Sequence, residues 1–269
     1  MTPLGPRAGV FTRSPAYVAA AVGLPASARL ADDVCGAVAV IPGSGNWWAR
    51  LLDARDEGAA AVVIADPAAL PREVFAAGTW SGGIPVVVDR PGLRADMLGD
   101  AVRARRGTLP RVVTVECAAP AALLDAVIRD GLGWARTLTG SQLTLRAGMA
   151  AAEGIMALLD SPVAGGSRIP STLVGTVLEG PAAGGLIQVL ALGEVRTEVA
   201  IDHAAGRVKL ETSTVEGALR VPERYEAPVR LALRRAIEAA SSGREVADLQ
   251  ELLEDQRRAH DVASARAAQ

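Results

Sequence analysis

The sequence predicts a two-domain α/β protein in which a parallel sheet is followed by an open, mainly antiparallel sheet with helices. In the first half, short apolar runs alternate with helical stretches, which is typical of βαβ units. In the second half, three β-rich runs follow one another between residues 186 and 212, which favours antiparallel neighbours. The length of 269 residues and the 50% hydrophobic content suffice for one or two cores. We place the domains at residues 1–118 and 119–269.

The first domain is predicted from five strands and the helices between them. Trp47–Glu57 carries apolar residues at helical spacing, and Ser14-Pro15 predicts the start of a short helix because proline suits the first helical turn. The predicted strands are Ala8–Thr12, Ala37–Ile41, Ala60–Ile64, Ile84–Val88 and Arg111–Cys117.

The second domain is predicted to begin with a long helix over Ala121–Thr139, interrupted at Gly131–Gly133, and to end with two helices. The closing helices are Glu223–Ala240 and Val246–Ala265, and the strands are Leu143–Arg146, Leu173–Leu178, Leu186–Leu192, Val195–Asp202 and Arg207–Thr212. The strand Leu186–Leu192 is apolar on both faces. We therefore expect helices on one of its faces and a second subunit on the other.

Charge and composition exclude several classes of function. The net charge of −2 gives no long-range attraction to nucleic acid or to an anionic membrane surface. No apolar run is long enough for a membrane span or a signal peptide. Two cysteines do not make a disulfide framework, so we expect a reducing, cytoplasmic location. The two histidines, His203 and His260, provide no recognisable metal site.

Several segments, taken in their order, carry a family resemblance. Ala37–Pro42, the stretch from Val62 to Pro67, Ile84–Val88, the stretch from Asp130 to Gly140 and the stretch from Gly243 to Leu249 resemble the Gfo/Idh/MocA family of oxidoreductases. The resemblance implies a Rossmann domain followed by an α/β domain built on a large open sheet that mediates oligomers. It also implies NAD(P)-dependent chemistry on sugars, polyols and related metabolites. The chain is identified as a shortened and degenerate member, with a truncated Rossmann-like parallel sheet.

The cofactor site departs from the family pattern. The family has a Gly-rich turn after its first strand, which lets the backbone approach a pyrophosphate at a helix N-terminus. Here the first strand runs into Arg13-Ser14-Pro15 without a glycine. Only about 25 residues separate the first two predicted strands, whereas one βαβ unit takes about 30. We therefore expect the adenosine half of the site to be missing and no cofactor to bind, with NAD(P) as the alternative.

The catalytic positions depart from the family as well. Where the resemblance implies Glu-Lys-Pro, with a lysine that contacts the reacting hydroxyl, this chain has Ala65-Asp66-Pro67. Asp66 cannot donate a hydrogen bond when it is ionised. A second alignment places Asp89-Arg90-Pro91 there, but an arginine is too basic for proton exchange. The family's histidine is absent near Asp130. Asp66 and Asp130 remain the candidate acid/base groups, with Asp89 as a further carboxylate.

Other residues are candidates for binding a ligand. The loop that contains Ser44 and Asn46 leads from a strand to a helix, which makes either an anion site or a plain turn with an N-cap. Trp47 faces a cleft or packs in the core. Trp134 stacks on a ligand or fills an interface, and Arg136 anchors a substrate or lies on the surface. Arg90 is a further candidate anchor.

Two functions follow from the sequence. In the first, the chain is a binding or regulatory subunit, a pseudoenzyme that forms a homodimer or joins a related oxidoreductase subunit through its C-terminal sheet. In the second, it is an oxidoreductase acting on a sugar, polyol or related small metabolite, with a reduced or partner-supplied NAD(P) site. The missing Gly-rich turn favours the first.

Overall fold

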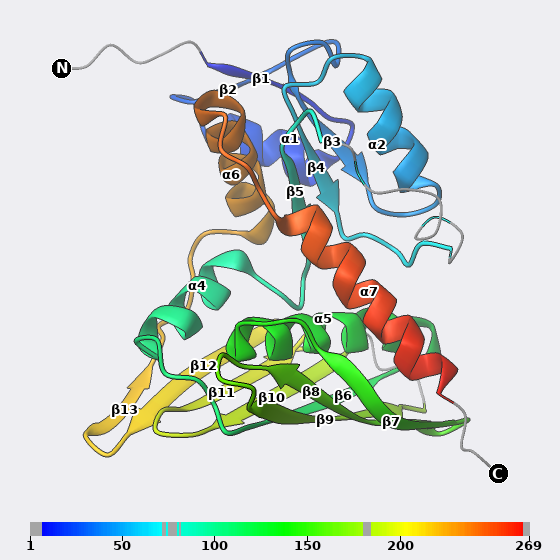
Figure 1. The fold of residues 1–269 in the computed structure, drawn as a ribbon. Coiled ribbons are helices and arrows are strands. Elements are labelled where there is room, and N and C mark those ends of the chain that lie inside the picture. The colour runs from blue at the N-terminus through cyan, green and yellow to red at the C-terminus, as the bar shows by residue number, and fades with distance from the viewer. Residues whose placement is uncertain (1–6, 72–73, 75–79, 81, 180–183, 266–269) are drawn as a thin grey trace. The chain divides into compact units, whose positions relative to one another are not determined.

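The computed structural model describes residues 7–71, 74, 80, 82–179 and 184–265, which form two compact units (Figure 1). The first unit holds the chain up to Pro91 together with Arg224–Leu253, and the second holds Gly92–Glu223 and the chain from Glu254 onward. This division differs from the predicted boundary at residue 118. The strand β6 (Val112–Ala119) pairs with strands of the second unit, and the first closing helix packs on the sheet of the first unit.

Sheet A, in the first unit, has the strand order β2-β1-β3-β4-β5 in the described part of the chain, and all its pairs are parallel. Its strands are β1 (Ala8–Phe11), β2 (Ala28–Leu30), β3 (Val38–Pro42), β4 (Ala61–Ala65) and β5 (Val86–Asp89). The predicted parallel sheet is thereby confirmed. The short strand β2 was not predicted, because three residues are too few to show a periodic pattern.

Helices cover both faces of sheet A. On one face lie α1 (Pro15–Val22) and α6 (Pro228–Ser242), and on the other lie α2 (Trp47–Asp56) and the first turns of α7 (Asp248–Ser264). Alternate residues along one strand therefore enter different cores, as Val63 and Ile64 of β4 do. Burial on both faces explains why these strands are apolar throughout.

Sheet B, in the second unit, has eight strands in the order β13-β12-β11-β10-β6-β9-β8-β7. Strands β6 and β9 are parallel and the other neighbours are antiparallel, so the predicted fold class is confirmed. The strands not yet given are β7 (Thr144–Ala151), β8 (Gly154–Pro162), β9 (Arg168–Val177), β10 (Leu186–Leu192), β11 (Arg196–Asp202), β12 (Arg207–Thr214) and β13 (Gly217–Arg220).

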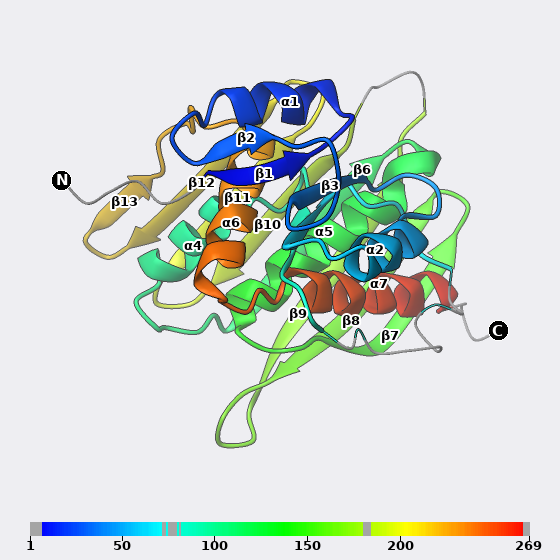
Figure 2. The ribbon, with the colours of Figure 1, turned by 90° about the horizontal axis from the view of Figure 1, so that it is seen from above.

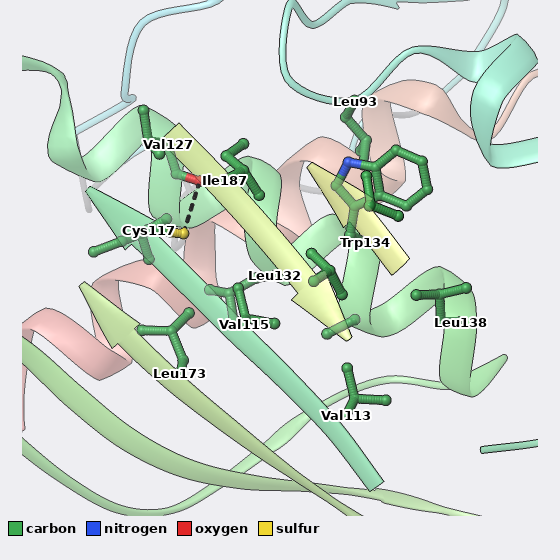
Figure 3. Close-up of a cluster of buried hydrophobic side chains, with 14 of the residues drawn as sticks. Leu93, Val113, Val115, Cys117, Val127, Leu132, Trp134, Leu138, Leu173 and Ile187 are labelled. Carbon is green, nitrogen blue, oxygen red and sulfur yellow. Dashed lines mark hydrogen bonds between the residues drawn. The ribbon is translucent and has the colours of Figure 1, made fainter. Parts of the chain in front are cut away.

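Helix α5 (Ala121–Thr139) lies along one face of sheet B, as Figures 1 and 2 both show, and α4 (Ala95–Ala104) contacts α5 and β12. Figure 3 shows the resulting core, in which Leu132 of α5 lies beside Val115 of β6 and Trp134 lies beside Leu93. The predicted interruption at Gly131–Gly133 is wrong, because α5 is continuous. A Cβ on Gly131 would lie 2.8 Å from Cys117 Sγ and from Val115 Cγ1, so the glycine allows the helix to approach the sheet.

The opposite face of sheet B is more open. Along β10, Ile187, Val189 and Ala191 are buried, whereas Leu186 and Leu192 on the other face are exposed.

No helix among the described residues has the length and apolar character needed to cross a lipid bilayer.

Candidate functional site

The carboxyl ends of the parallel strands define a candidate site at one edge of sheet A. From β1 the chain moves outward to β2 on one side, and from β3 it moves to β4 and β5 on the other. Ligands of open α/β sheets bind outside the strand ends at such a switch point. The segments that follow the strand ends are Thr12–Ser14 after β1, Ala31–Asp33 after β2, Gly43–Asn46 after β3, Asp66 after β4 and Arg90 after β5. Ser44, Asn46, Asp66 and Arg90, predicted from the sequence, therefore share this edge.

The loop between β3 and α2 is held in place by backbone and side-chain hydrogen bonds. Asn46 Oδ1 accepts a hydrogen bond from the Ala49 backbone N–H at 3.2 Å, so Asn46 is the N-cap of α2. One guanidinium nitrogen of Arg50 donates to the carbonyls of Pro42, at 2.8 Å, and Ser44. Sequence reasoning missed Arg50, although its place on the first turn after the cap is visible in the sequence.

Asp66 ends β4 in an unusual backbone conformation. Its φ is +47°, in the left-handed region that non-glycine residues rarely adopt. The Asp66 backbone N–H donates to the Asp89 carbonyl at 2.9 Å, which places the two residues at the ends of adjacent strands. The Asp66 side chain belongs to an exposed residue. Backbone strain of this kind is found most often at functional positions, which makes Asp66 a candidate site residue.

Tyr17 joins this edge from the first turn of α1. Its hydroxyl donates to Asp89 Oδ2 at 2.7 Å, and its side chain is buried. Burial raises the pKa of the Tyr17 hydroxyl well above its ordinary value, and the carboxylates of Asp89 and Asp66 raise it further. A phenol and two carboxylates thus lie at one edge. Sequence reasoning missed Tyr17, and the only signal was its place just after the first strand.

Trp47 lies at the same edge but has a packing role. It is fully buried, and its Nε1 donates to the Ala68 carbonyl at 2.9 Å. Its ring meets the ring of Trp48 edge-on at a centroid distance of 5.8 Å. A ring enclosed in this way has no open face on which a ligand could stack. Arg90, after β5, is also buried.

The other predicted residues lie in the second unit, on α5. Asp130 is buried and accepts a hydrogen bond from the Gly92 backbone N–H at 3.0 Å. Arg129 Nε lies 3.4 Å from Asp130 Oδ1. Trp134 is fully buried, and its Nε1 donates to the Gly92 carbonyl at 2.8 Å. Asp130 and Trp134 therefore hold the backbone of Gly92 between them, which is a structural role.

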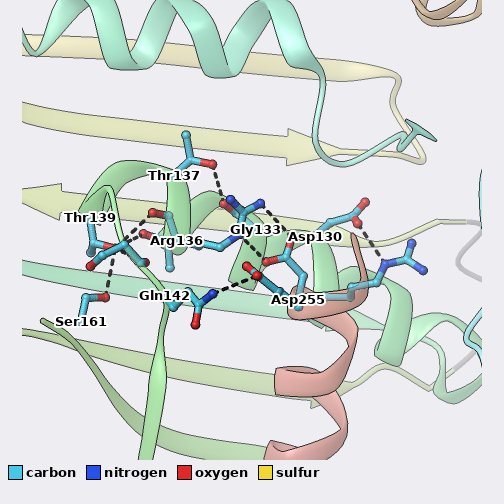
Figure 4. A network of polar contacts seen from close by, with 12 residues as sticks. Asp130, Gly133, Arg136, Thr137, Thr139, Gln142, Ser161 and Asp255 are labelled. Carbon is cyan, nitrogen blue, oxygen red and sulfur yellow. Dashed lines mark hydrogen bonds and ion pairs between the residues drawn. The ribbon is translucent and has the colours of Figure 1, made fainter. Parts of the chain in front are cut away.

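Arg136 is held by a carboxylate from α7, as Figure 4 shows. Its Nε and one terminal nitrogen donate to the two oxygens of Asp255 at 2.7 and 3.2 Å, and the Asp255 side chain is buried. Nearby, Gln142 Nε2 donates to Glu254 at 2.8 Å. This bidentate pair joins α5 to the middle of α7, so the structure shows Arg136 engaged within the protein rather than open to a substrate.

Two further observations on the described residues concern the segment after β1 and the grouping of metal-ligating side chains. A further parallel strand lies between the first two predicted strands in the chain, because β2 pairs with β1 from Ala8↔Ala28 to Val10↔Leu30. The exposed residues Asp32 and Asp33 follow β2 after one intervening residue, Ala31. Among the described residues, no group of three or more histidine, cysteine, aspartate or glutamate side chains is placed to hold a metal ion.

Comparison with known proteins identifies relatives by structure and none by sequence. No protein-family model matches the chain, and no curated protein is similar in sequence. In structure it is similar to the UDP-N-acetylglucosamine 3-dehydrogenase GnnA of Acidithiobacillus ferrooxidans, with 18% identity, a TM-score of 0.65 and coverage of 97% of this chain and 90% of that one. It is also similar to an oxidoreductase from Sinorhizobium meliloti, with 10% identity, a TM-score of 0.67 and coverage of 97% of both chains.

A third similar structure bears on the cofactor. KijD10, a 3-ketoreductase from Actinomadura kijaniata solved in complex with NADP, shares 14% identity and a TM-score of 0.62, with 98% of this chain and 90% of that one covered. At these identities the similarity establishes the fold. The expectation that no cofactor binds is corrected by this finding, since a chain of the same fold holds NADP. The absence of a Gly-rich turn was too narrow a criterion.

Proposed function

We propose that this chain, whose fold is that of the Gfo/Idh/MocA oxidoreductases, is an NAD(P)-dependent oxidoreductase acting on a sugar, polyol or related small metabolite. The observation that carries the proposal is the parallel sheet A with its switch point between β1 and β3, in a fold shared with a ketoreductase that holds NADP. The same fold occurs in a UDP-N-acetylglucosamine 3-dehydrogenase, so nucleotide sugars belong to the substrate classes to be tested.

The residues at the edge of sheet A fit a dinucleotide in a reduced site. In the described part of the chain, no side chain caps α1, so the N–H groups of its first turn are available to a pyrophosphate. Arg13, just before this turn, adds a positive charge. The carboxylates of Asp32 and Asp33 follow the second strand, where dinucleotide-binding folds carry an acidic residue for the ribose hydroxyls. These features support binding without a Gly-rich turn.

The bound nicotinamide would supply the hydride acceptor or donor. For the proton, the exposed carboxylate of Asp66 is the candidate acceptor, in place of the family's lysine. A carboxylate within reach of a substrate hydroxyl can act as a general base. Asp130 does not share this role in the proposal, because it is buried against the Gly92 backbone.

The direct test is calorimetric titration of the purified protein with NADH and NADPH up to millimolar concentration. We expect saturable binding, weakened about tenfold when Asp32 and Asp33 are both replaced by alanine, a loss of about 1.4 kcal/mol. Glu57→Ala, an exposed substitution at the far end of α2, is the matched control and should bind like the parent. Absence of heat with both nucleotides would overturn the cofactor assignment.

Catalysis is tested by screening nucleotide sugars, free sugars and polyols for NAD(P)H formation, and ketosugars for the reverse reaction. We expect Asp66→Asn to reduce turnover by about 10²-fold or more while nucleotide binding persists. Unchanged turnover in Asp66→Asn would remove Asp66 from the mechanism without affecting the cofactor assignment.

We also propose that a second copy of the chain covers the open face of sheet B. This face carries the exposed apolar side chains Met149, Met156, Leu158, Leu186 and Leu192. It also carries acidic and basic side chains on the neighbouring strands β11 and β12. There Lys209 Nζ lies 3.3 Å from carboxylate oxygens of both Glu198 and Glu211. Apolar residues beside charges of both signs suit a self-complementary, two-fold contact.

Light scattering over a wide concentration range tests this assembly. We expect a dimer that Leu158→Glu dissociates, whereas Val22→Glu, at an exposed apolar site on α1, leaves the dimer intact. A monomer at all concentrations would contradict it. A mass that rises only when a related oxidoreductase subunit is added would instead favour the hetero-oligomer.

A further inference from the structure

Three residues at the edge of sheet A, Tyr17, Asp66 and Asp89, lie together in an arrangement that the family resemblance does not supply. The Tyr17 hydroxyl donates to Asp89 Oδ2 at 2.7 Å from a buried position. Asp66 and Asp89 lie side by side at the ends of the adjacent strands β4 and β5. The Asp66 backbone N–H donates to the Asp89 carbonyl at 2.9 Å. The two carboxylates differ in surroundings, because Asp89 is half-buried under the phenol and Asp66 is exposed on a left-handed turn.

We propose that Tyr17 is a positioning residue that keeps the Asp89 carboxylate ionised, and that this fixed negative charge assigns the proton-accepting role to Asp66. The inference rests on the proposed oxidoreductase function and specifies how its acid/base group is divided. A hydrogen bond donated to a carboxylate favours its charged form, and a nearby like charge disfavours ionisation of the second carboxylate. Pairs whose surroundings differ in this way divide acid/base roles.

The phenol is suited to this role because it remains a donor. Burial raises the pKa of the Tyr17 hydroxyl above its ordinary value, and the charges of Asp89 and Asp66 raise it further. Tyr17 therefore stays protonated at any pH at which the enzyme would work. Tyr17 lies on the first turn of α1, which begins at Pro15.

The other charged groups near this pair are the same in each comparison proposed below. Arg90 follows Asp89 in the chain. Asp248, at the start of α7, accepts a hydrogen bond from the Val88 backbone N–H at 3.1 Å and is paired with Arg235 of α6 through two contacts of 2.8 Å. Arg50, on the first turn of α2, donates to carbonyls of the neighbouring loop after β3. Differences between variants therefore isolate the phenol and the second carboxylate.

The test is an NMR titration of the full chain carrying aspartate labelled with ¹³C at the side-chain carboxyl. The signals of Asp66 and Asp89 are assigned with Asp66→Asn and Asp89→Asn. We expect Tyr17→Phe to move the Asp89 midpoint upward by about one pH unit, because one hydrogen bond to a charged group is lost. We expect Asp89→Asn to move the Asp66 midpoint downward, because the neighbouring negative charge is gone.

An unchanged Asp89 midpoint in Tyr17→Phe, or an unchanged Asp66 midpoint in Asp89→Asn, would overturn the inference. Asp89→Asn retains an acceptor for the phenol, so this variant gives a reading even if Tyr17→Phe does not fold. The titration needs neither nucleotide nor substrate. Failure of NADH and NADPH to bind would therefore refute the proposed function and leave this result readable. Once a substrate is found, Tyr17→Phe should also shift the pH profile of kcat/KM.

Discussion

The edge of sheet A and the polar side chains of α5 contain the same residue types in opposite surroundings. On α5, Asp130 and Arg129 are both buried and in contact. At the edge of sheet A, Asp66 is exposed and its backbone is strained. An enclosed carboxylate contributes to the fold through its buried contacts, whereas an exposed carboxylate at a strand end is the one that we propose as a site residue. From the sequence alone, Asp66 and Asp130 could not be told apart, because each is an aspartate in a segment that resembles the family.

The largest expected effect tests the structural side of this comparison. Asp130→Ala leaves Arg129 buried without this partner and the Gly92 N–H without an acceptor, so it should destabilise the second unit by about 3 kcal/mol or more. Urea unfolding checks it. Asp66→Ala is the matched substitution and should change the free energy of unfolding by about 0.5 kcal/mol or less. Equal effects at the two sites would remove the distinction.

An intermediate effect is expected at alkaline pH, where both units hold a buried acid in its neutral form. Burial raises the pKa of the Cys117 thiol, with a further contribution from Asp130, and burial also raises that of the Tyr17 hydroxyl. The unfolded chain releases these protons first. Stability is therefore complete below about pH 8.5 for the thiol and about pH 10 for the phenol, and falls above these values by about 1.4 kcal/mol per pH unit for each group.

Urea unfolding between pH 8 and pH 11 measures this decline. Cys117→Ala should flatten the part that begins near pH 8.5, and Tyr17→Phe the part that begins near pH 10. The exposed Tyr225 is the control, because Tyr225→Phe should leave the curve unchanged. A curve that none of these substitutions alters would show that the buried groups are not the source.

The smallest expected effect concerns the strained turn at the end of β4. Asp66→Gly removes the side chain that disfavours φ of +47°, so it should stabilise the first unit by about 0.5 to 1 kcal/mol. Asp66→Ala retains the strain and should not stabilise. Thermal or urea unfolding of the two variants gives the difference. A loss of stability in Asp66→Gly would mean that the carboxylate contributes contacts that outweigh the strain.

The sequence predicted those parts of the fold that depend on local pattern. The strands of sheet A were found because both their faces are buried, as in β4, where four successive residues are enclosed. The strand β2 was missed because it has only three residues. Helix α4 and strand β8 were also missed, and β7 is longer than predicted. The interruption predicted at Gly131 was wrong, because this glycine is there to let α5 pack closely on β6. The sequence around Gly131 does not reveal that contact.

The site was predicted in part, for the same reason. Asp66, Ser44 and Asn46 follow strand ends, and the rule that parallel strands end at one edge brings them together. Tyr17 was missed because its partner Asp89 is 72 residues away in the sequence. The contacts that bury Asp130 and Trp134 were not predicted, because both bind Gly92, about forty residues earlier, and burial by distant segments has no local pattern.

The loop after β3 lies so close to the end of β4 that a Cβ on Gly43 would come within 2.4 Å of the Asp66 carbonyl oxygen and of Pro67 Cα. Two backbones touch there, and neither can move without disturbing the edge that carries Asp66. A Cβ on Gly45, two residues on, would meet only a terminal nitrogen of Arg50, at 4.0 Å, and the φ of Gly45 is +61°, so asparagine is an acceptable replacement there. In a library of single substitutions, position 45 should accept some residues other than glycine, whereas position 43 should accept none. The absence of a side chain at Gly43 would then set the distance between the loop after β3 and the end of β4.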